Sequence, residues 1–489
     1  MTRSSAYLKG DPYMSFRKDF LWGGSISAAQ AEGAWNEGGK APIQVDYGDV
    51  GSSSGARHIV YRTKQGNKGH QVQFNRLPEG GEYADFDDVI YSNRTGIDFY
   101  HRYKEDIALF GQMGMKVFNT SISWARVFPE GMKGKANEEG VAYYHDLFKE
   151  CLKHNIQPFV TLSKYDEPLI LEKKYGGFEN RKMIDEFVHF ASFCFEEFRE
   201  VKLWVTFNEI NVLTVARRDK DVYQALHNQM VAASIAVQKG HMIDPENRIG
   251  CMVAGQCIYP YTCDPADVMK AYKQFQDSFA YCADTMVKGK YPSFAQRLWK
   301  EKDLVLQISE EDKEDLKKGK ADFLAFSYYN SNVATTHEAQ DEVLGNLSSG
   351  VKNPYLDTSD WGWQMDPKGF KYWLHFLNDR YDVPLFDIEN GLGAYDEVTD
   401  GKVHDQYRID YLKNHVANMK EAVEEGVDLF GYTVWTPIDV VSFVSGQMDK
   451  RYGLIYVNRN DKVEGDFSRI PKDSFYWYKH VIETNGEEL

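Results

Sequence analysis

Two glutamates, Glu209 and Glu389, each end a short run of β-branched and aromatic residues, and an amide, Asn208, stands beside the first of them. The two runs are WVTFNEIN at residues 204–211 and FDIENG at residues 386–391. Carboxyl groups about 5 to 5.5 Å apart suit retaining glycoside hydrolysis, in which one acts as nucleophile and the other as general acid and then base. Taken alone, each glutamate is weak evidence, because carboxylates at strand ends often form salt bridges at a rim.

The elements that would carry these residues follow a repeating order of strand and helix. Short β-rich runs end in polar residues, and each is followed by a segment with helical periodicity, such as residues 180–201 and 405–426. The second of these segments ends on Gly426, which suits a helix C-terminus. The predicted strands span residues 20–27, 116–123, 157–163, 202–209, 248–255, 322–329, 384–390 and 429–437.

This alternation, without a linker or a change of composition, predicts an α/β fold in the form of a single (β/α)8 TIM barrel with long βα loops over residues 1–489. Active sites of such barrels lie at the C-terminal ends of the strands. Glu209 would end the fourth strand and Glu389 the seventh. We therefore expect their carboxyl groups to face each other across the mouth of the barrel.

Residues 48–96 fit neither the helical nor the strand period and are rich in Gly, Asp, Asn and Tyr. They follow the first predicted strand, where a barrel carries a rim loop, so we interpret them as a β1–α1 loop insertion over the mouth. Loops of this length are usually functional lids or disordered segments. The interspersed aromatic residues favour partial order.

The net charge argues against a nucleic-acid partner, and the distribution of apolar residues argues against a membrane partner. The formal net charge is −16 and the pI is near 5.4, whereas nucleic-acid binding depends on clustered Lys and Arg. The N-terminal residues contain no apolar signal-peptide core, and no run of about 18 apolar residues that could span a bilayer occurs. We expect a cytoplasmic protein without a membrane or nucleic-acid partner, and a homo-oligomer is compatible with the sequence.

The cysteines give no sign of a metal site or a disulfide framework. They contain no C-x-x-C pair, and we interpret them as reduced thiols. No cluster of His with carboxylates occurs at the predicted strand ends, so a metal-dependent barrel hydrolase or aldolase fits less well. The six residues are Cys151, Cys194, Cys251, Cys257, Cys263 and Cys282.

The sequence resembles the family 1 glycoside hydrolases, and within them the 6-phospho-β-glucosidase and 6-phospho-β-galactosidase branch. The resemblance covers nearly the whole chain and implies a barrel enzyme that needs no cofactor. It rests on FLWGGSISAAQAEGAWNEGG from residue 20, GIDFYHRYKEDIALF from residue 96, SISWARVFPEG from residue 121, TFNEIN from residue 206, DFLAFSYYNS from residue 322, WGWQMDPKGF from residue 361, ENGLGAYD from residue 389 and KRYGLIYV from residue 450.

The resemblance implies a role for each residue around the two carboxyl groups. It assigns Glu209 as the acid/base and Glu389 as the nucleophile. Asn208 would donate a hydrogen bond to the sugar 2-hydroxyl, a contact that strengthens in the transition state. Tyr328 would hydrogen-bond the nucleophile.

Two further residues would form the sugar subsite by the same resemblance. Gln30 would hold sugar hydroxyls, and it is a polar residue in a run of small residues that already requires a partner. Trp435 would form the floor of the subsite, although a Trp in a strand is more often a core residue.

The segment IDVVSFVSGQMDKRYG, which follows the eighth predicted strand, favours a phosphorylated sugar. Members of the family that bind unmodified sugars carry a glutamate at the position of Ser442, where it accepts hydrogen bonds from the 4- and 6-hydroxyls. A hydroxyl there removes a charge that would repel a 6-phosphate, and Lys450 and Tyr452 can add a cation and a donor. The alternative for DKRYG is a solvated turn.

Three positions depart together from the family pattern. The arginine that contacts the nucleophile is replaced by Asn119, the sugar-binding histidine by Lys164, and an apolar residue by Asp387. We expect Asn119 and Lys164 to contact the substrate. Since side chains alternate along a strand, we expect Asp387 to point to the same inward side as Glu389. A second carboxylate there needs a cation, so we expect Lys164 to pair with Asp387 or to contact an altered substrate group.

The function that these residues favour is retaining hydrolysis of a 6-phospho-β-glycoside, most simply a 6-phospho-β-glucoside, with an altered sugar subsite. Two alternatives stay open. One is a β-glycosidase for an unphosphorylated or differently charged sugar, and the other is a barrel that binds sugar phosphates without cleaving them.

Overall fold

The computed structural model describes residues 15–489 except 53–54, 56, 218, 339–340 and 344–349. Eight parallel strands close into a barrel in the order β1-β17-β14-β10-β8-β7-β6-β5, which confirms the predicted fold class. Each observed strand lies within a predicted range. The strands are β1 (Leu21–Ser25), β5 (Val117–Ser121), β6 (Gln157–Ser163), β7 (Leu203–Phe207), β8 (Arg248–Gly255), β10 (Leu324–Tyr328), β14 (Leu385–Asn390) and β17 (Leu429–Trp435).

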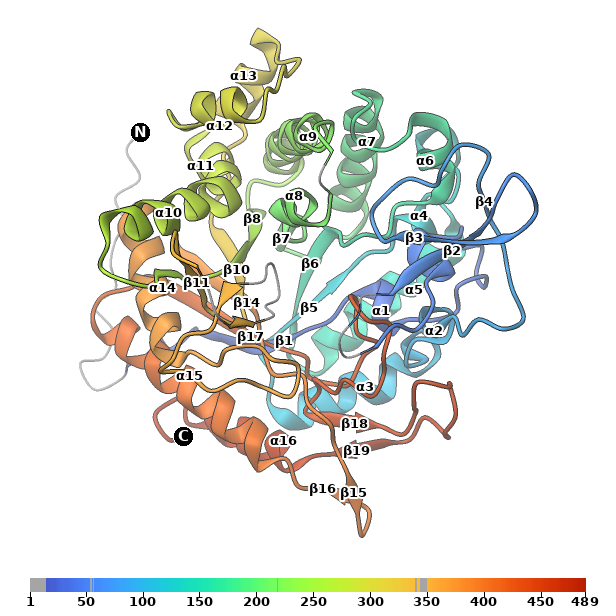
Figure 1. Ribbon diagram of the computed structural model, residues 1–489. Coiled ribbons are helices and arrows are strands. Elements are labelled where there is room, and N and C mark those ends of the chain that lie inside the picture. Colours follow the sequence, from blue (N-terminus) through green and yellow to red (C-terminus); the bar gives the residue numbers. More distant parts are fainter. Residues whose placement is uncertain (1–14, 53–54, 56, 218, 339–340, 344–349) are drawn as a thin grey trace.

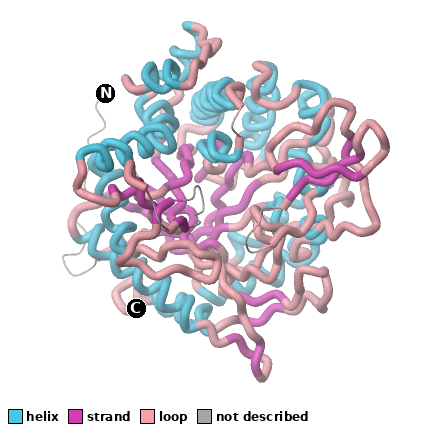
Figure 2. Tube along the Cα trace, viewed as in Figure 1, coloured by secondary structure: helices cyan, strands magenta, loops and turns pink. Residues whose placement is uncertain are grey.

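Helices surround this barrel, with the strands at the centre and the long helices at the periphery (Figures 1 and 2). The predicted helical segments at residues 180–201 and 405–426 are α7 (Lys182–Glu197) and α15 (Gln406–Glu424). The other helices of eleven or more residues are α3 (Phe99–Met113), α5 (Glu138–Lys153), α9 (Val222–Ile243), α10 (Pro265–Phe275), α14 (Pro367–Arg380) and α16 (Asp473–Glu483).

Shorter helices and helical turns complete the connections between strands and long helices. No helix among the described residues is both long and apolar enough to cross a membrane. The short elements are α1 (Ala28–Ala31), α2 (Ser92–Thr95), α4 (Trp124–Val127), α6 (Leu169–Tyr175), α8 (Leu213–Ala216), α11 (Tyr281–Lys288), α12 (Ala295–Glu301), α13 (Glu310–Lys318), η1 (Gln44–Tyr47), η2 (Gly131–Lys133), η3 (Ile210–Val212) and η4 (Gln276–Ala280).

The interior of the barrel is filled by apolar side chains, so the barrel is a packed core. Phe386 lies at the centre of this packing, with its ring 5.1 Å from that of Phe159 and 5.0 Å from that of Phe430. Gly431 makes room for it, because a Cβ there would lie 2.2 Å from Cε2 of Phe386. This packing fixes the strand ends above it.

The insertion at residues 48–96 contains a small antiparallel sheet at the edge of the mouth (Figure 1). Its order is β3-β2-β4, and residues 53–54 and 56 of the insertion lie outside the described part. The sheet comprises β2 (His58–Arg62), β3 (Lys68–Val72) and β4 (Glu82–Tyr83). The remaining short strands are β9 (Ile258–Pro260), β11 (Asn332–Ala334), β12 (Glu342–Val343), β13 (Gly350–Val351), β15 (Val398–Thr399), β16 (Lys402–Val403), β18 (Ile455–Val457) and β19 (Arg469–Pro471).

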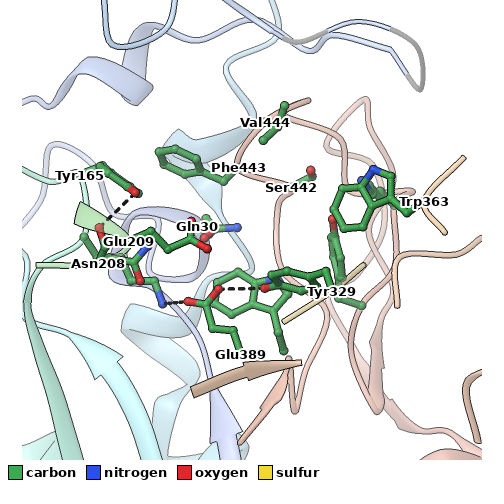
Figure 3. A pocket seen from close by; sticks show the side chains of 14 residues that line it. Gln30, Tyr165, Asn208, Glu209, Tyr329, Trp363, Glu389, Ser442, Phe443 and Val444 are labelled. Atoms are coloured by element: carbon green, nitrogen blue, oxygen red, sulfur yellow. Dashed lines mark hydrogen bonds and ion pairs between the residues drawn. The ribbon is translucent and has the colours of Figure 1, made fainter. Parts of the chain in front are cut away.

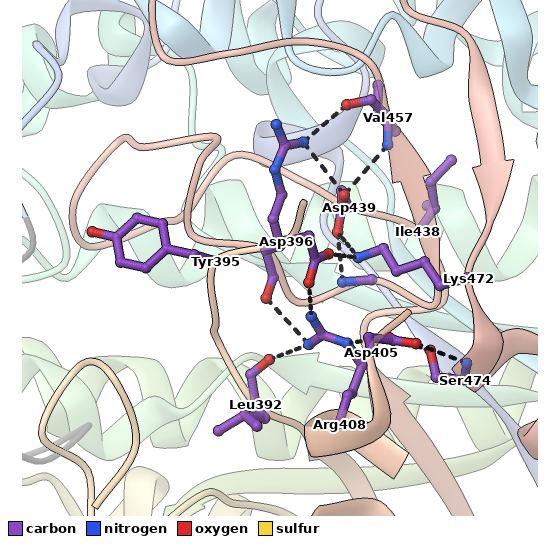
Figure 4. Close-up of polar contacts among 12 residues, drawn as sticks. Leu392, Tyr395, Asp396, Asp405, Arg408, Ile438, Asp439, Val457, Lys472 and Ser474 are labelled. Carbon is purple, nitrogen blue, oxygen red and sulfur yellow. Dashed lines mark hydrogen bonds and ion pairs between the residues drawn. The ribbon is translucent and has the colours of Figure 1, made fainter. Parts of the chain in front are cut away.

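Buried charges hold the long loop that follows β17 (Figure 4). Asp439 in this loop accepts from Lys472 Nζ at 2.8 Å and from Arg451 Nη1 at 3.3 Å. Lys472 also pairs with Asp396, which in turn accepts from Arg408 at 3.0 Å. Because these groups are buried and mutually paired, the network fixes the path of the loop.

We expect Asp439→Ala to lower the free energy of unfolding by about 3 to 5 kcal/mol, because it removes a buried carboxylate between Lys472 and Arg451. Chemical denaturation measures the change. Asp449→Ala is a matched control, since that carboxylate is 42% exposed and lies 3.5 Å from Arg451. The control should change stability by about 1 kcal/mol or less, and equal losses in both variants would contradict the role of the network.

Candidate active site

Glu209 and Glu389 line one open pocket of about 560 Å³ at the mouth of the barrel (Figure 3). The structure therefore brings together the two carboxyl groups that the sequence singled out, from β14 and from the turn after β7. The lining residues are Gln30, Lys164, Tyr165, Asn208, Glu209, Tyr329, Trp363, Glu389, Trp435, Ser442, Phe443, Val444, Lys450 and Tyr452.

Both oxygens of Glu389 are held by donors. Lys164 Nζ lies 2.6 Å from Oε1 and forms a buried ion pair, and the hydroxyl of Tyr329 donates to Oε2 at 2.8 Å. Lys164 follows directly after β6, and Tyr329 directly after β10. These two donors fix the carboxylate in position, as a nucleophile requires.

Glu209 is in a different environment. The hydroxyl of Ser327 donates to its Oε1 at 2.6 Å, and no ion pair to Glu209 occurs among the described residues. Burial raises the pKa of Glu209 to about 8, and the charge of Glu389 adds to this effect. Its backbone adopts φ +40°, a left-handed conformation that side chains other than glycine adopt only under constraint. Because its pKa is about 8, Glu209 keeps a proton at neutral pH and can donate it.

Asn208 precedes Glu209 and also lines the pocket. Its backbone carbonyl accepts from the hydroxyl of Tyr165 at 3.2 Å, and its backbone N–H donates to the carbonyl of Ser163 at 2.9 Å. Its side-chain Oδ1 is buried without a hydrogen-bond partner among the described residues. The backbone contacts fix the residue, while part of its amide stays unpaired.

Gln30 and Trp435 lie on another side of the pocket. The amide of Gln30 is held by the protein, since its Oε1 accepts from Ser27 Oγ at 2.7 Å and its Nε2 donates to the carbonyl of Val441 at 2.7 Å. Trp435 is the last residue of β17, and Lys164 Nζ lies 4.5 Å from the centre of its ring. This cation–π contact gives the lysine a second partner besides Glu389.

The loop after β17 brings Ser442, Lys450 and Tyr452 to the same pocket. The Lys450 residue is only 4% exposed, and Nζ has no hydrogen bond or ion pair among the described residues. It lies 4.2 Å from the ring of Trp363 and 5.1 Å from that of Trp361. Burial lowers the pKa of Lys450 to about 7. A buried ammonium without a counter-ion is a ready partner for an anionic ligand group.

The prediction for Tyr328 is wrong. Its hydroxyl donates to the backbone carbonyl of Asp366 at 3.0 Å, and its ring stacks on Phe370 outside the barrel. The alternation along β10 explains this, because Ala325 belongs to the interior core and Ser327 reaches Glu209, which leaves Tyr328 facing the helices. The neighbouring Tyr329 makes the contact with Glu389.

Asn119 does not line the pocket, contrary to the expectation that it contacts substrate. It lies in β5, fully buried, where its Oδ1 accepts from Ser25 Oγ at 2.8 Å. Its Nδ2 donates to the carbonyl of Phe159 at 3.1 Å and to Thr161 Oγ1 at 3.2 Å. The amide is too short to reach the mouth and instead links β1, β5 and β6 below it.

Asp387 also differs from the prediction, because it does not share the inward side with Glu389. Its neighbours Phe386 and Ile388 belong to the interior core, and the register between β14 and its two neighbours shifts after Asp387. Burial, helped by the charge of Glu389, raises the pKa of Asp387 far above its usual range. Asp387 therefore lies on the outer side, away from the pocket, and Lys164 pairs with Glu389 instead.

Several lining residues were not identified from the sequence. Tyr165 and Phe443 directly follow Lys164 and Ser442, Val444 follows Phe443, and Trp363 stands in the quoted segment WGWQMDPKGF. Tyr329 is the second tyrosine of the quoted FSYYNS. Adjacency to a predicted site residue could have found Tyr165, Phe443 and Tyr329, and membership of a quoted family segment could have found Trp363.

Comparison with known proteins agrees with this geometry. The sequence pattern of glycosyl hydrolase family 1 matches residues 13–487 of this chain. The chain is 45% identical to the aryl-phospho-beta-D-glucosidase BglA of Bacillus subtilis, over 96% of this chain and 99% of that protein. It is 41% identical to the 6-phospho-beta-glucosidase AscB of Escherichia coli, over 97% and 99%. A family 1 β-glucosidase structure from Thermotoga maritima superimposes with a TM-score of 0.79 at 27% identity, covering 97% of this chain and 99% of that one. The chain therefore belongs to glycosyl hydrolase family 1.

Proposed function

We propose that this chain hydrolyses 6-phospho-β-glucosides with net retention of configuration. The observation that carries the proposal is one pocket with an ionised and a protonated carboxyl group near each other and a buried, unpaired lysine among its other lining residues. The relatives named above as phospho-glucosidases support the same substrate class.

The first step uses the two carboxyl groups in opposite protonation states. An oxygen of Glu389 attacks the anomeric carbon while the bond to the leaving oxygen breaks, and Glu209 transfers its proton to that oxygen. Asn208 would hold the sugar 2-hydroxyl during this step. The product is a glycosyl ester on Glu389 and a free alcohol or phenol.

The second step reverses the proton transfer. The ionised Glu209 removes a proton from a water molecule, whose oxygen attacks the anomeric carbon and displaces Glu389. Both carboxyl groups return to their starting states, so no redox partner or other co-reactant is consumed. In both steps Lys164 and Tyr329 hold the nucleophile in position.

The phosphate would bind at Lys450. Ser442 and Tyr452 line the same pocket with hydroxyl donors, and the neutral Ser442 avoids the repulsion that a carboxylate would cause. Binding a phosphate would also supply the counter-ion that the lysine lacks. Gln30 and Trp435 would contact the sugar ring between the phosphate and the anomeric carbon.

The setting of this reaction follows from the charge of the substrate. A sugar phosphate does not cross membranes unaided, so we place the enzyme in the cytoplasm, where phosphorylating uptake delivers such substrates. The net charge of −16 makes a nucleic-acid partner unfavourable.

We expect the wild-type enzyme to prefer p-nitrophenyl 6-phospho-β-glucoside to the same glucoside without phosphate. In Lys450→Met, the ratio of the two kcat/KM values should fall about 10- to 100-fold, because a charged hydrogen bond is lost. Release of p-nitrophenol measures both rates. Faster cleavage of the unphosphorylated glucoside, or ligand binding without any turnover, would contradict the proposal.

The pKa of Glu209 sets the alkaline limit of the first step. We expect kcat to fall by about tenfold per pH unit above pH 8, because the proton needed by the leaving group is lost there. Measuring kcat at saturating substrate removes the effect that titration of Lys450 has on substrate binding. Glu209→Gln should be slower and lose this alkaline limb, and a limb that persists in the variant would assign it to another group.

The ion pair between Lys164 and Glu389 also affects Glu209, since the charge of Lys164 lowers the pKa of Glu209. In Lys164→Met we expect kcat to fall by about 100-fold or more, and the alkaline limb of kcat to move to higher pH. Lys164→Arg keeps the charge and should keep the limb near its original position. If Lys164→Met leaves the limb unmoved, the lysine is not electrostatically coupled to the acid.

A further inference from the structure

The end of β10 contacts both catalytic glutamates. Ser327, the penultimate residue of this strand, donates from Oγ to Oε1 of Glu209 at 2.6 Å. Tyr329, directly after the strand, donates to Oε2 of Glu389 at 2.8 Å. Ser327 is also paired in register with Glu389 of the neighbouring β14. One short segment therefore binds the acid on one side and lies beside the nucleophile on the other.

Glu209 reaches this segment across an intervening strand, because β8 lies between β7 and β10 in the barrel. Its backbone N–H donates to Sδ of Met252 in β8 at 3.0 Å, and its side chain continues to Ser327 in β10. The backbone of Glu209 turns out of the extended conformation here, with φ +40° and ψ +54°. The residue is thus held at its backbone by one strand and at its carboxyl group by the next.

The Ser327 hydroxyl has a single acceptor for its hydrogen among the described residues, which is Oε1 of Glu209. Ser327 is fully buried. If Oε1 carried the carboxyl proton and donated it to the serine, the serine hydrogen would have no acceptor, which is unfavourable in a buried site. The serine therefore donates to Oε1 whether Glu209 is protonated or ionised.

This direction of the hydrogen bond leaves the other oxygen of Glu209 for the reaction. Within the part of the chain that the structure describes, Oε1 takes the hydrogen bond to this carboxyl group and Oε2 takes none. Glu209 lines the catalytic pocket. A proton on Oε2 can pass to a leaving oxygen there without first breaking a hydrogen bond within the protein.

We propose that Ser327 is a positioning residue, which ties Oε1 of Glu209 to β10 and so makes Oε2 the oxygen that gives and takes the proton. This inference rests on the proposed function and assigns a role in both of its steps. In the first step the O–H bond at Oε2 breaks, its electron pair stays on Glu209, and the leaving oxygen takes the proton. In the second step a proton from water forms a new O–H bond at Oε2 while the water oxygen attacks the anomeric carbon.

The same contact affects the pH at which Glu209 loses its proton. A donated hydrogen bond favours the ionised carboxylate, so Ser327 lowers the pKa of Glu209 while burial raises it. Replacing the serine by alanine changes no charged group, so a shifted pH profile reports the lost donor. The titratable groups near Glu209 are Glu389 on β14, Lys164, Tyr165 and Glu167 in the loop after β6, and Tyr329 after β10.

The test compares two aryl 6-phospho-β-glucosides that differ in their need for a proton. Dinitrophenolate is a weak base that leaves without assistance, whereas phenolate must be protonated as it leaves. In Ser327→Ala, the ratio of kcat/KM for the phenyl glycoside to that for the dinitrophenyl glycoside should fall by about tenfold or more, because the acid is no longer held in place. The alkaline limb of kcat for the phenyl glycoside should move to higher pH. A general loss of structure would lower the rates on both glycosides alike and leave the ratio unchanged.

Two variants serve as controls. Ser327→Thr keeps the hydroxyl and should hold the ratio within about threefold of the wild type. Ser234→Ala removes another buried serine hydroxyl, on α9, whose Oγ has no hydrogen-bond partner among the described residues. It should change neither the ratio nor the alkaline limb. Ser327→Ala itself removes an oxygen atom and adds no bulk, so it does not crowd the barrel.

The outcomes separate this inference from the proposed function. An unchanged ratio with an unmoved limb in Ser327→Ala, or equal losses on both glycosides, would overturn the positioning role while hydrolysis of phospho-glucosides stands. A wild-type enzyme that cleaves neither glycoside would overturn both.

Discussion

The ion pair between Lys164 and Glu389 is the interaction on which the chemistry of this barrel depends. Two carboxyl groups share one largely buried pocket, and two ionised carboxylates there would repel each other. The lysine, at 2.6 Å from Glu389, stabilises the charge on that side chain. Glu209 has a hydroxyl donor but no ion pair among the residues that the structure describes, so burial and the charge of Glu389 favour its protonated form. One cation thus divides an equivalent pair of residues into a nucleophile and an acid.

This division requires that segments 180 positions apart meet at one point, which the closed barrel provides. Glu209 follows β7 and Glu389 lies in β14, and the packed phenylalanines below hold both strand ends. The opposite wall depends on buried charges, because the loop that presents Ser442 and Lys450 is tied by Asp439 to Lys472 and Arg451. The site therefore depends on two kinds of support, an apolar core inside the barrel and an ionic network beside it.

Much of this arrangement could be predicted from the sequence, and the errors have a common cause. The strand positions and the two glutamates follow from alternating patterns and strand-end motifs, which are local properties. The directions in which the side chains of Asp387 and Tyr328 point depend instead on how neighbouring strands pair. The register of β14 shifts after Asp387, which separates it from Glu389, and whether a strand slips by one residue depends on its neighbours in the sheet. Which of two adjacent tyrosines reaches the nucleophile is set by the end of β10, which the sequence places only to within a residue or two.

The partner of Lys164 could not be predicted for a related reason. From the sequence, Lys164 was expected to pair with Asp387 or to contact an altered substrate group, because both carboxylates were expected inside the barrel. In the structure Asp387 lies between the strands and the helices, where burial raises its pKa, and it does not pair with the lysine. Lys164 forms its buried ion pair with Glu389.

The position of Lys164 also explains why position 119 can carry an asparagine in place of the arginine of the family pattern. Asn119 lies in β5 and pairs across to Phe159 in the neighbouring β6, the strand that leads into Lys164. An arginine in β5 would have to rise through the layer where Asn119 now bonds Ser25 and Thr161, whereas Lys164 reaches Glu389 from above that layer. An arginine at position 119 alone would place two cations beside Glu389. Replacing Lys164 by a neutral residue alone would leave Glu389 without a cation. Neither change by itself reproduces the charge balance that gives the two glutamates different protonation states.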